Sequence, residues 1–232
     1  MTRKKGETAP ENTQQDLQKQ AEGHEETGAK CEALLDTLFA EFSAMTENLE
    51  GVPVQEIPRI DLYMDQVLTF MEEHLSSDTR DPEHDKILTK TMINNYVKND
   101  VLIPPVRKKY GMDHMVLLLI IFYLKSFLSI SDIQKVLAPL GRQDEPLEGI
   151  YRQVYESMGE EKRALLDETR QQFERAARSF PENEELQRFS LIARMAMEIH
   201  LKKLFIERLL DEETRRDSGK GKGEEIKGKA TT

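Results

Sequence analysis

The residues with the clearest chemical character lie between Lys86 and Tyr110. This segment, KILTKTMINNYVKNDVLIPPVRKKY, holds six cationic side chains and one anionic side chain, Asp100, so its net charge is +5. The whole chain has 33 Lys and Arg residues against 43 Asp and Glu residues, and its net charge is −10. A cationic segment in an acidic chain indicates attraction to a polyanion such as the DNA backbone.

The same segment carries hydrogen-bonding side chains at helical spacing. Between Lys90 and Lys98 the apolar side chains of Met92, Ile93 and Val97 can point inward, which leaves amides, a hydroxyl and cations outside. Amide side chains pair with adenine edges, and lysine contacts guanine edges or phosphates. We therefore predict base contacts from Lys90, Thr91, Asn94 and Asn95, and phosphate contacts from Tyr96, Lys98, Arg107, Lys108, Lys109 and Tyr110. The alternative interpretation is a solvated surface helix followed by a basic loop.

The elements that would position these residues have a helical period. Apolar side chains at spacings of three and four predict helices over 31–49 and 60–75. A short helix from about Lys90 to Lys98 is capped by Thr89, and the most hydrophobic helix follows at about 112–128. Ser129, with Asp132 three residues later, begins another short helix. Pro104-Pro105 leads into an extended linker or small wing, and no segment predicts a convincing strand.

The expected fold is therefore all-α. It has a helix-turn-helix head with a minimal wing, long C-terminal helices and disordered ends. The expected domains are a disordered tail at 1–28, a helical DNA-binding-like domain at 29–140, a helical hairpin at 141–214 and a disordered basic tail at 215–232. The apolar stripe from Leu186 to Leu209 has two interpretations. It packs back on the head, or it forms a homodimer interface, which would let two copies read paired DNA half-sites.

Several functional classes find no support in the composition. The single Cys31 excludes an internal disulfide, and the five scattered histidines show no metal-ligand spacing. Nothing supports an enzyme, a cofactor or a metal. The longest apolar run, Val116 to Leu124, is too short to cross a membrane, so we expect a soluble, cytoplasmic protein. The methionines predict core packing; an effector pocket lined by them is the alternative for Met92, Met112, Met115, Met195 and Met197.

The segment from Ile93 to Leu137 resembles the DNA-binding head of the MerR-type transcriptional regulators. Ile93-Asn94-Asn95-Tyr96 matches the end of that family's recognition helix, and Pro104-Pro105 matches the proline that follows it. The apolar turn corresponds to Val101-Leu102, the wing's Arg-Tyr to Lys109-Tyr110, and the last helix to Ser129-Ile130 with Ile133. The departures are Asn94 where the family has Arg, Asp100 where it has Gly, and a short wing.

A wider block, from Ile60 to Leu137, resembles an uncharacterised bacterial family known as a domain of unknown function. The shared pieces are IDLYMDQV, LTKTMINNYVK and KKY. That family is itself taken to bind DNA because of the same helix-turn-helix likeness, so the resemblance implies a fold more than an activity.

Two hypotheses follow. The first is a sequence-specific transcriptional regulator that binds double-stranded DNA as a homodimer, and the sequence does not tell whether an effector ligand controls it. The second is a non-catalytic helical adaptor whose basic patch docks an acidic protein. A salt titration on random duplex separates them, because only a DNA binder should lose affinity steeply as salt rises.

Overall fold

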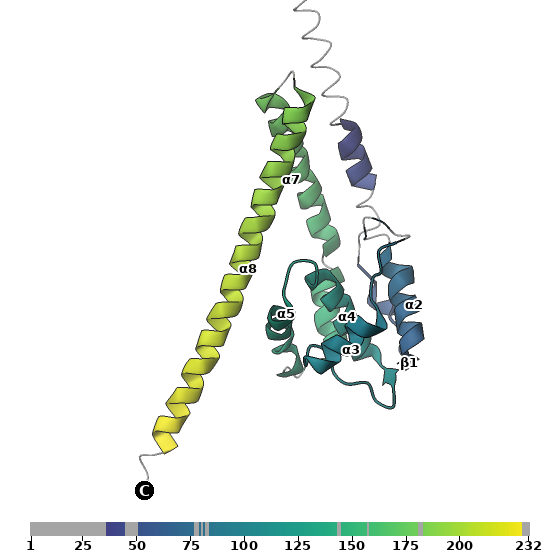
Figure 1. The fold of residues 1–232 in the computed structure, drawn as a ribbon, viewed down its shortest axis with the longest axis vertical. Helices are drawn as coiled ribbons and strands as arrows, with labels where there is room; N and C mark the ends of the chain where they lie inside the picture. The colour runs from purple at the N-terminus through teal and green to yellow at the C-terminus, as the bar shows by residue number, and fades with distance from the viewer. Residues whose placement is uncertain are drawn as a thin grey trace, which may run out of the picture. The chain divides into compact units, whose positions relative to one another are not determined.

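The computed structural model describes residues 36–44, 51–76, 79, 81, 84–142, 145–156, 158–180 and 183–228. The expected tail at 1–28, Cys31 and residues 229–232 lie outside the described residues. The described residues are mostly helical, which confirms the predicted fold class (Figure 1). They form two compact units. We name Thr46–Lys162 with Glu198–Thr232 the head unit, and Met1–Met45 with Arg163–Met197 the arm unit.

The head unit is built from short helices and one pair of short strands. The regular elements are β1 (Leu62–Tyr63), α2 (Met64–Leu75), α3 (Lys90–Lys98), β2 (Lys109–Tyr110), α4 (Met112–Leu124), α5 (Ile130–Leu137) and α6 (Leu147–Tyr151). Tighter or wider turns of helix lie at Val54–Glu56 and Leu140–Arg142 (3-10) and at Arg152–Glu156 (π).

The centre of the head unit is α4, which lies between α5 and α2 in Figure 1. All nine consecutive residues from His114 to Phe122 are buried. A helix that is apolar on every side must be surrounded, and side chains from the neighbouring elements complete one core around it. The prediction of a buried helix here is confirmed, although it ends at Leu124 rather than near Leu128.

One polar side chain is buried at the start of α4. His114 is 6% exposed; its Nδ1 accepts a hydrogen bond from the backbone N–H of Gly111 (3.1 Å). The neutral ring then carries its proton on Nε2, which lies 3.4 Å from the carbonyl oxygen of Pro104 and donates to it. The imidazole therefore joins α4 to the loop that follows α3.

The sequence predicts no convincing strand apart from a small wing, and the structure adds the strand β1, which pairs with the base of that wing. β1 pairs with β2 in an antiparallel ladder, with Leu62 opposite Tyr110 and Tyr63 opposite Lys109. Two-residue strands are too short to show an alternating pattern, and the pairing joins segments far apart in the sequence. The all-α class stands with this small ribbon added.

The head unit continues past residue 140, where the sequence analysis ended the DNA-binding-like domain. Tyr151 on α6 is 1% exposed and belongs to the same core as α4. Its hydroxyl donates a hydrogen bond of 2.8 Å to the carbonyl oxygen of Val52. This tertiary anchor ties α6 to the start of the head, and the prolines between α5 and α6 do not reveal it.

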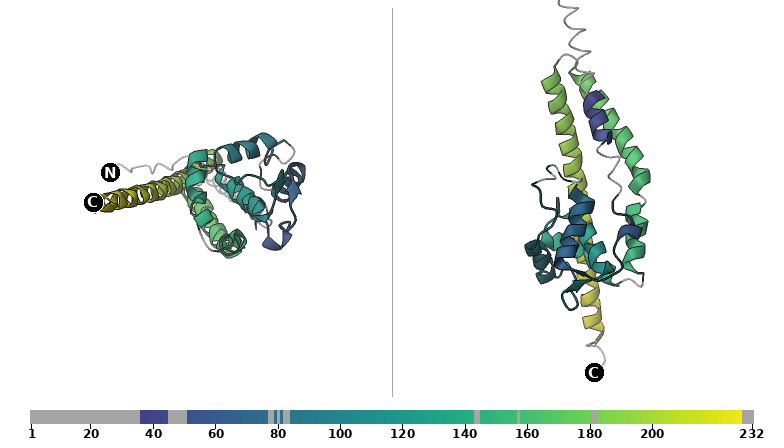
Figure 2. Two further views of the ribbon diagram at one scale, coloured as in Figure 1. Left: turned by 90° about the horizontal axis from the view of Figure 1, so that it is seen from below. Right: turned by 90° about the vertical axis from the view of Figure 1, so that its right-hand side faces the viewer.

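Two long helices contribute to both units: α7 (Met158–Ser179) and α8 (Glu184–Gly228). Asn183 Oδ1 accepts a hydrogen bond of 2.9 Å from the backbone N–H of Leu186 and so caps α8. Figure 2 shows α8 as one continuous helix from two further sides. The helix includes 215–228, which belong to the segment 215–232 predicted to be a disordered basic tail. Arg, Lys and Glu in that segment favour helix, although each glycine opposes it by about 1 kcal/mol.

In the arm unit a helix at 36–44, part of the predicted first helix, packs on α7. The rings of Phe39 and Phe173 meet edge to face, with centroids 5.7 Å apart. None of the helices in the described part of the chain combines the length and apolar character needed to cross a membrane.

Candidate nucleic-acid interface

The first turn of α3 forms as the sequence predicts. Thr89 Oγ1 accepts a hydrogen bond of 3.1 Å from the backbone N–H of Met92, which satisfies one of the free amides at the helix start. The helix then runs from Lys90 to Lys98, so its predicted bounds are confirmed.

The last turn of α3 closes through a left-handed residue. Asp100 has φ 53°, and its N–H donates to Val97 O at 3.2 Å. The N–H of Val101 donates to Tyr96 O at 2.9 Å. These two bonds form a Schellman motif, which usually places glycine in the left-handed position. Aspartate tolerates that conformation better than most residues, and this explains how the turn forms without glycine.

The two sides of α3 differ in exposure as predicted. Ile93 is fully buried, and Met92 and Val97 pack against the core. The outer side is solvent-exposed and follows a spacing of three and four residues, which places it in one stripe along the helix. Its members are Lys90, Thr91, Asn94, Asn95 and Lys98.

Two predicted phosphate contacts are not supported by the positions of their side chains. Tyr96 is 5% exposed and Tyr110 is 3% exposed, and both belong to the core. Burial raises the pKa of both phenols. The spacing of Tyr96 places it beside Ile93 on the inner side of α3, while Tyr110 packs its ring edge to face on His114 at 5.3 Å. The candidate interface therefore leaves out both tyrosines.

The outer side chains of α3 differ in what already binds them. Lys90 forms an ion pair of 2.6 Å with Asp65 on α2. Asn95 Oδ1 accepts a hydrogen bond of 3.0 Å from Asn99 Nδ2, which leaves the amide N–H₂ of Asn95 outward. Among the described residues, Asn94 and Lys98 have no side-chain partner, so their full hydrogen-bonding capacity faces solvent.

A tight hairpin presents the second group of cations. The N–H of Val106 donates to Lys109 O at 3.1 Å, and the N–H of Lys109 donates to Val106 O at 3.0 Å. The two residues between them, Arg107 and Lys108, have φ of 52° and 64°. Positive φ at both central positions defines a type I′ turn, which strongly prefers Asn-Gly. The predicted minimal wing is thus present, and two strained cations form its tip.

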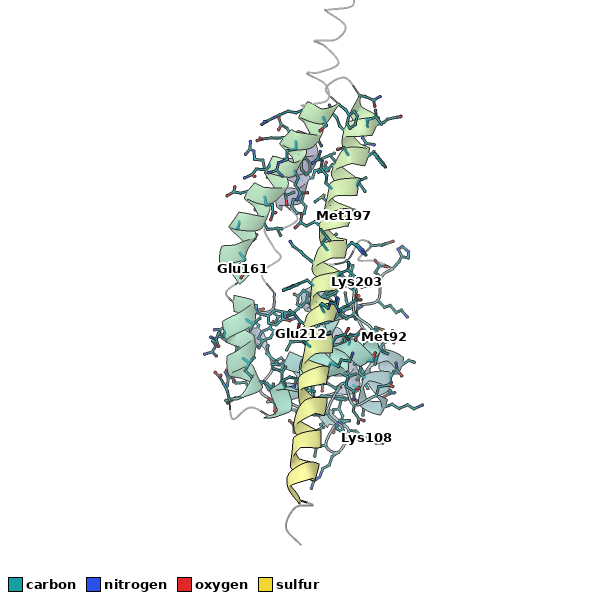
Figure 3. The ribbon with its side chains drawn as sticks, turned by 90° about the vertical axis from the view of Figure 1, so that its left-hand side faces the viewer. Met92, Lys108, Glu161, Met197, Lys203 and Glu212 are labelled. Atoms are coloured by element: carbon teal, nitrogen blue, oxygen red, sulfur yellow. The ribbon has the colours of Figure 1, made fainter. Side chains whose placement is uncertain are left out.

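Both cations at the tip of the wing are exposed, and Figure 3 shows Lys108 below Met92. Non-glycine residues in the left-handed region cost of order 1–3 kcal/mol each and are concentrated at functional sites. The sequence signals a basic loop here but does not reveal the strain.

Contacts through α2 bring α3 and the wing together. Asp65, which pairs with Lys90, lies in the first turn of α2 directly after β1. In β1, Tyr63 pairs with Lys109, whose Nζ lies 5.2 Å from the centre of the Tyr63 ring. The first turn of α3 and the base of the wing therefore adjoin the same end of α2.

Sequence reasoning missed the apolar side chains around the wing. Four are exposed by 45–70%: Ile60, Tyr63, Ile103 and Val106. The spacing of the predicted helix over 60–75 places Ile60 and Tyr63 on its inner face, but α2 begins only at Met64 and both side chains are exposed. Ile103 and Val106 belong to no periodic stripe, so the sequence gives no sign of their exposure. Tyr63 and Val106 flank the cations of the wing with apolar surface that can contact sugars or thymine methyl groups.

Three of the methionines named for the alternative of an effector pocket belong to the core or pack against it. Met115 is buried and Met92 and Met112 pack against the core, which favours the core-filling interpretation of these three residues. No group of three or more metal-ligating side chains occurs in the part of the chain that the structure describes.

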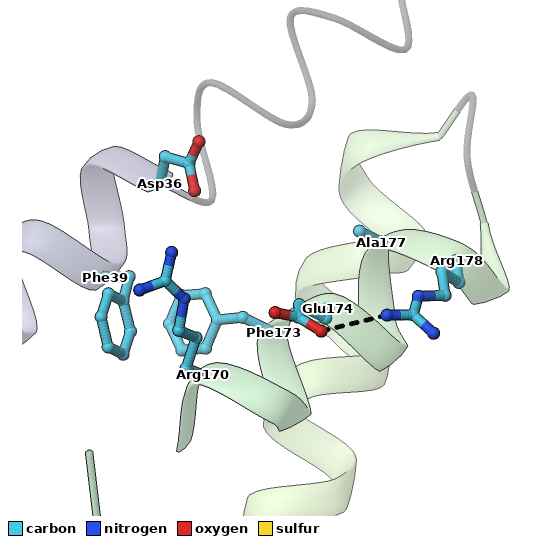
Figure 4. Close-up of a pocket in the computed structure, with 7 residues that line it drawn as sticks. All are labelled: Asp36, Phe39, Arg170, Phe173, Glu174, Ala177 and Arg178. Carbon is cyan, nitrogen blue, oxygen red and sulfur yellow. Dashed lines mark hydrogen bonds and ion pairs between the residues drawn. The ribbon is translucent and has the colours of Figure 1, made fainter. Parts of the chain in front are cut away.

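The arm unit contains an open cavity of about 440 Å³ between the helix at 36–44 and α7. Figure 4 shows Arg170 beside Phe39, with its guanidinium 5.5 Å from the ring centre, and the ion pair of Arg178 with Glu174 at 3.0 Å. Two acids and two arginines line it, so it has no net preference for an anion or a cation.

The comparison with known proteins concerns the head. Residues 52–158 match the family model described as "Domain of unknown function (DUF1836)". Neither a curated protein nor a solved structure matches this chain. The matched residues include α3, the wing and α4, and with them every side chain of the candidate interface. The chain is thus similar to the DUF1836 family over residues 52–158, and the candidate interface lies within the matched residues.

Proposed function

We propose that the head unit binds double-stranded DNA and that the protein regulates transcription. In this proposal α3 is the recognition helix of a MerR-like helix-turn-helix, and the Arg107-Lys108 hairpin is its wing. The observation that carries the proposal is the exposed stripe of Thr91, Asn94, Asn95 and Lys98 beside a wing whose tip holds two strained cations. Amides and cations on a short helix suit the major groove, and cations beside it suit the flanking phosphates.

The order of elements supports the likeness to MerR-type heads. Helix α2, helix α3, a hairpin, and helices α4 and α5 follow one another as the resemblance implies. The connection between α2 and α3 runs from 76 to 89, which is longer than the three or four residues usual between such helices. The left-handed Asp100 explains how this chain makes the turn where the family has glycine.

The proposed roles follow from the partners already present. Thr91, Asn94 and Asn95 contact base edges. Lys90 can contact a base edge only if its ion pair with Asp65 breaks. An exposed ion pair of this kind stabilises the protein by about 0–1 kcal/mol, so breaking it costs little free energy. Phosphates are contacted by Lys98, Arg107, Lys108 and Lys109.

A salt titration tests DNA binding by the full-length protein. Affinity for a random duplex should fall steeply between low and physiological salt. Lys108→Ala should weaken binding to every sequence alike and reduce the salt slope by about one. Arg188→Ala, which removes an exposed cation from the arm unit, is the matched control and should leave the slope unchanged. Absence of binding at low salt would end the proposal.

Base readout needs a second measurement. After a binding site has been selected from a random duplex library, Asn94→Ala should cost about 1–3 kcal/mol at particular base pairs and relax the preference there. Gln153→Ala removes an exposed amide outside the interface and should change nothing. If Asn94→Ala weakened all sequences equally, as Lys108→Ala should, direct readout would be excluded.

An adaptor is the second candidate function. The exposed apolar side chains around the wing favour it, because apolar surface beside cations also suits an acidic protein partner. In that case the same α3 surface would dock acidic side chains, and the protein would show little affinity for duplex DNA at any salt concentration.

A further inference from the structure

The part of α8 within the head unit is apolar on two sides. On its inner side Ile206 packs against the core and Leu210 is 7% exposed. On the outer side Leu201, Phe205 and Leu209 are 58%, 65% and 49% exposed. An α-helix turns by about 100° per residue, so Leu201 and Leu210 lie on opposite sides. A globular surface helix needs only one apolar stripe, and the second requires an explanation.

The inner side of α8 is fixed by its neighbour α5. Asp132 on α5 accepts hydrogen bonds from Ser129 and Lys135, which lower its pKa, and the charge of Lys203 on α8 adds to this effect. Figure 3 shows Lys203 and Glu212 along this stretch of α8. Since Lys203, Ile206 and Leu210 follow a spacing of three and four residues, they share one side. The stripe containing Phe205 is therefore left facing away from the head core.

The exposed stripe has the area that a subunit interface needs. With Leu204, which is 48% exposed, the stripe presents roughly 400 Å² of apolar surface, as large as the largest patch on a typical monomer. Apolar atoms make up about 60% of an ordinary interface. The stripe with its polar border would thus bury roughly 700 Å² per partner, close to the 800 Å² or so of a standard interface.

The spacing of the stripe identifies the partner. Leu201 precedes Phe205 by four residues, and Leu209 follows it by four. A two-fold axis through Phe205 would bring Leu201 of one copy against Leu209 of the other, and the two Phe205 rings together. A patch that is complementary to itself in this way is what a two-fold dimer requires.

We infer that this stretch of α8 pairs antiparallel with the same stretch of a second copy of this chain, through Leu201, Leu204, Phe205 and Leu209. The inference deepens the proposed function in one respect: two copies would offer two α3 helices to paired half-sites. Only that consequence rests on DNA binding. The interface itself rests on the exposed stripe.

Sedimentation of the full-length protein over a range of concentrations tests the interface. The wild type should be a dimer, and Leu201→Glu combined with Phe205→Glu should sediment as a monomer with unchanged helical content. Ile60→Glu, which alters an equally exposed apolar side chain elsewhere in the head unit, should remain a dimer. A monomeric wild type, a dimeric double variant or a dissociated Ile60→Glu would each overturn the inference.

The antiparallel direction has its own test in a Cys31→Ser background. A mixture of Leu201→Cys and Leu209→Cys should give a disulfide-linked dimer on oxidation, while neither variant alone should. Cross-linking of each variant with itself would instead indicate parallel helices and overturn the antiparallel pairing. A cross-linked dimer that fails to bind duplex DNA would remove the proposed function and leave the interface standing.

Discussion

Helices α3 and α4 are neighbours in the head unit and differ in what surrounds them. α4 is buried along nine consecutive residues, so nearly every side chain on it contributes to the core. α3 buries Ile93 and Tyr96 and leaves a complete stripe of polar side chains to solvent. The difference separates two tasks: α4 supplies stability, and α3 is free to carry contacts with another molecule. Substitutions in the two helices should therefore change different measurements.

The largest effect on the free energy of unfolding should come from a substitution in α4. Leu118 on α4 is fully buried, and Leu118→Ala should lower the free energy of unfolding by about 2–5 kcal/mol through lost burial and a residual cavity. Urea denaturation of the full-length protein measures this. Asn94→Ala on the outer side of α3 should stay within about 0.5 kcal/mol of wild type. Equal losses in both variants would show that α3 is structural as well.

A change in the wing extends the comparison, because it should raise the stability of the fold and weaken the binding of duplex DNA. Replacing the turn by Arg107→Asn with Lys108→Gly supplies the residues that a type I′ turn prefers and should raise the free energy of unfolding by about 1–2 kcal/mol. The same change removes two cations, so the salt slope of duplex binding should fall by about two. A variant that is more stable and binds as tightly as wild type would show that the strained tip does not touch DNA.

A smaller effect is expected at the start of α3. Thr89→Ala removes the hydroxyl that caps Met92 N–H and should cost about 1 kcal/mol, measured as a lower Tm. Thr91→Ala is the matched control, since Thr91 is exposed and does not cap the helix. If the two variants melted alike, the cap would not stabilise the helix as the hydrogen bond indicates.

The smallest effect is a dependence on pH at the start of α5. Hydrogen bonds from Ser129 and Lys135 hold the pKa of Asp132 below its ordinary value of about 3.9. The ionised carboxylate therefore adds stability above that ordinary value and loses it as the pH falls through the lower, folded pKa. Asp132→Asn should be less stable than wild type at neutral pH by at most about 1 kcal/mol, and the two should converge in acid. A difference independent of pH would exclude this account.

Local chemistry made much of the head predictable. The bounds of α3, its Thr89 cap, the Ser129 cap of α5 and the outward set on α3 all depend on neighbours within four residues, and the sequence shows those directly. The pairing of β1 with β2 and the Tyr151 anchor join distant segments, which no local pattern encodes.

The misplaced residues share one physical cause. A helical period shows that a face exists but not what covers it. Tyr96 was placed outward for its hydroxyl, although its spacing from Ile93 puts it on the covered side. On α8 the apolar stripe predicted from Leu186 to Leu209 does not tell which residues are covered: Ile206 packs inward, whereas Leu201, Phe205 and Leu209 face solvent. Only the fold distinguishes the two faces.

The uniform apolar character of α4 has a consequence for how the core finds a single arrangement. A helix that is apolar on every side gains almost as much free energy from burial at one angle of rotation about its axis as at another. The imidazole of His114, held between the Gly111 amide and the Pro104 carbonyl, is satisfied at one angle alone. His114 therefore fixes the rotation of α4 about its axis. Through the Pro104 carbonyl it also fixes the loop that leads into the wing.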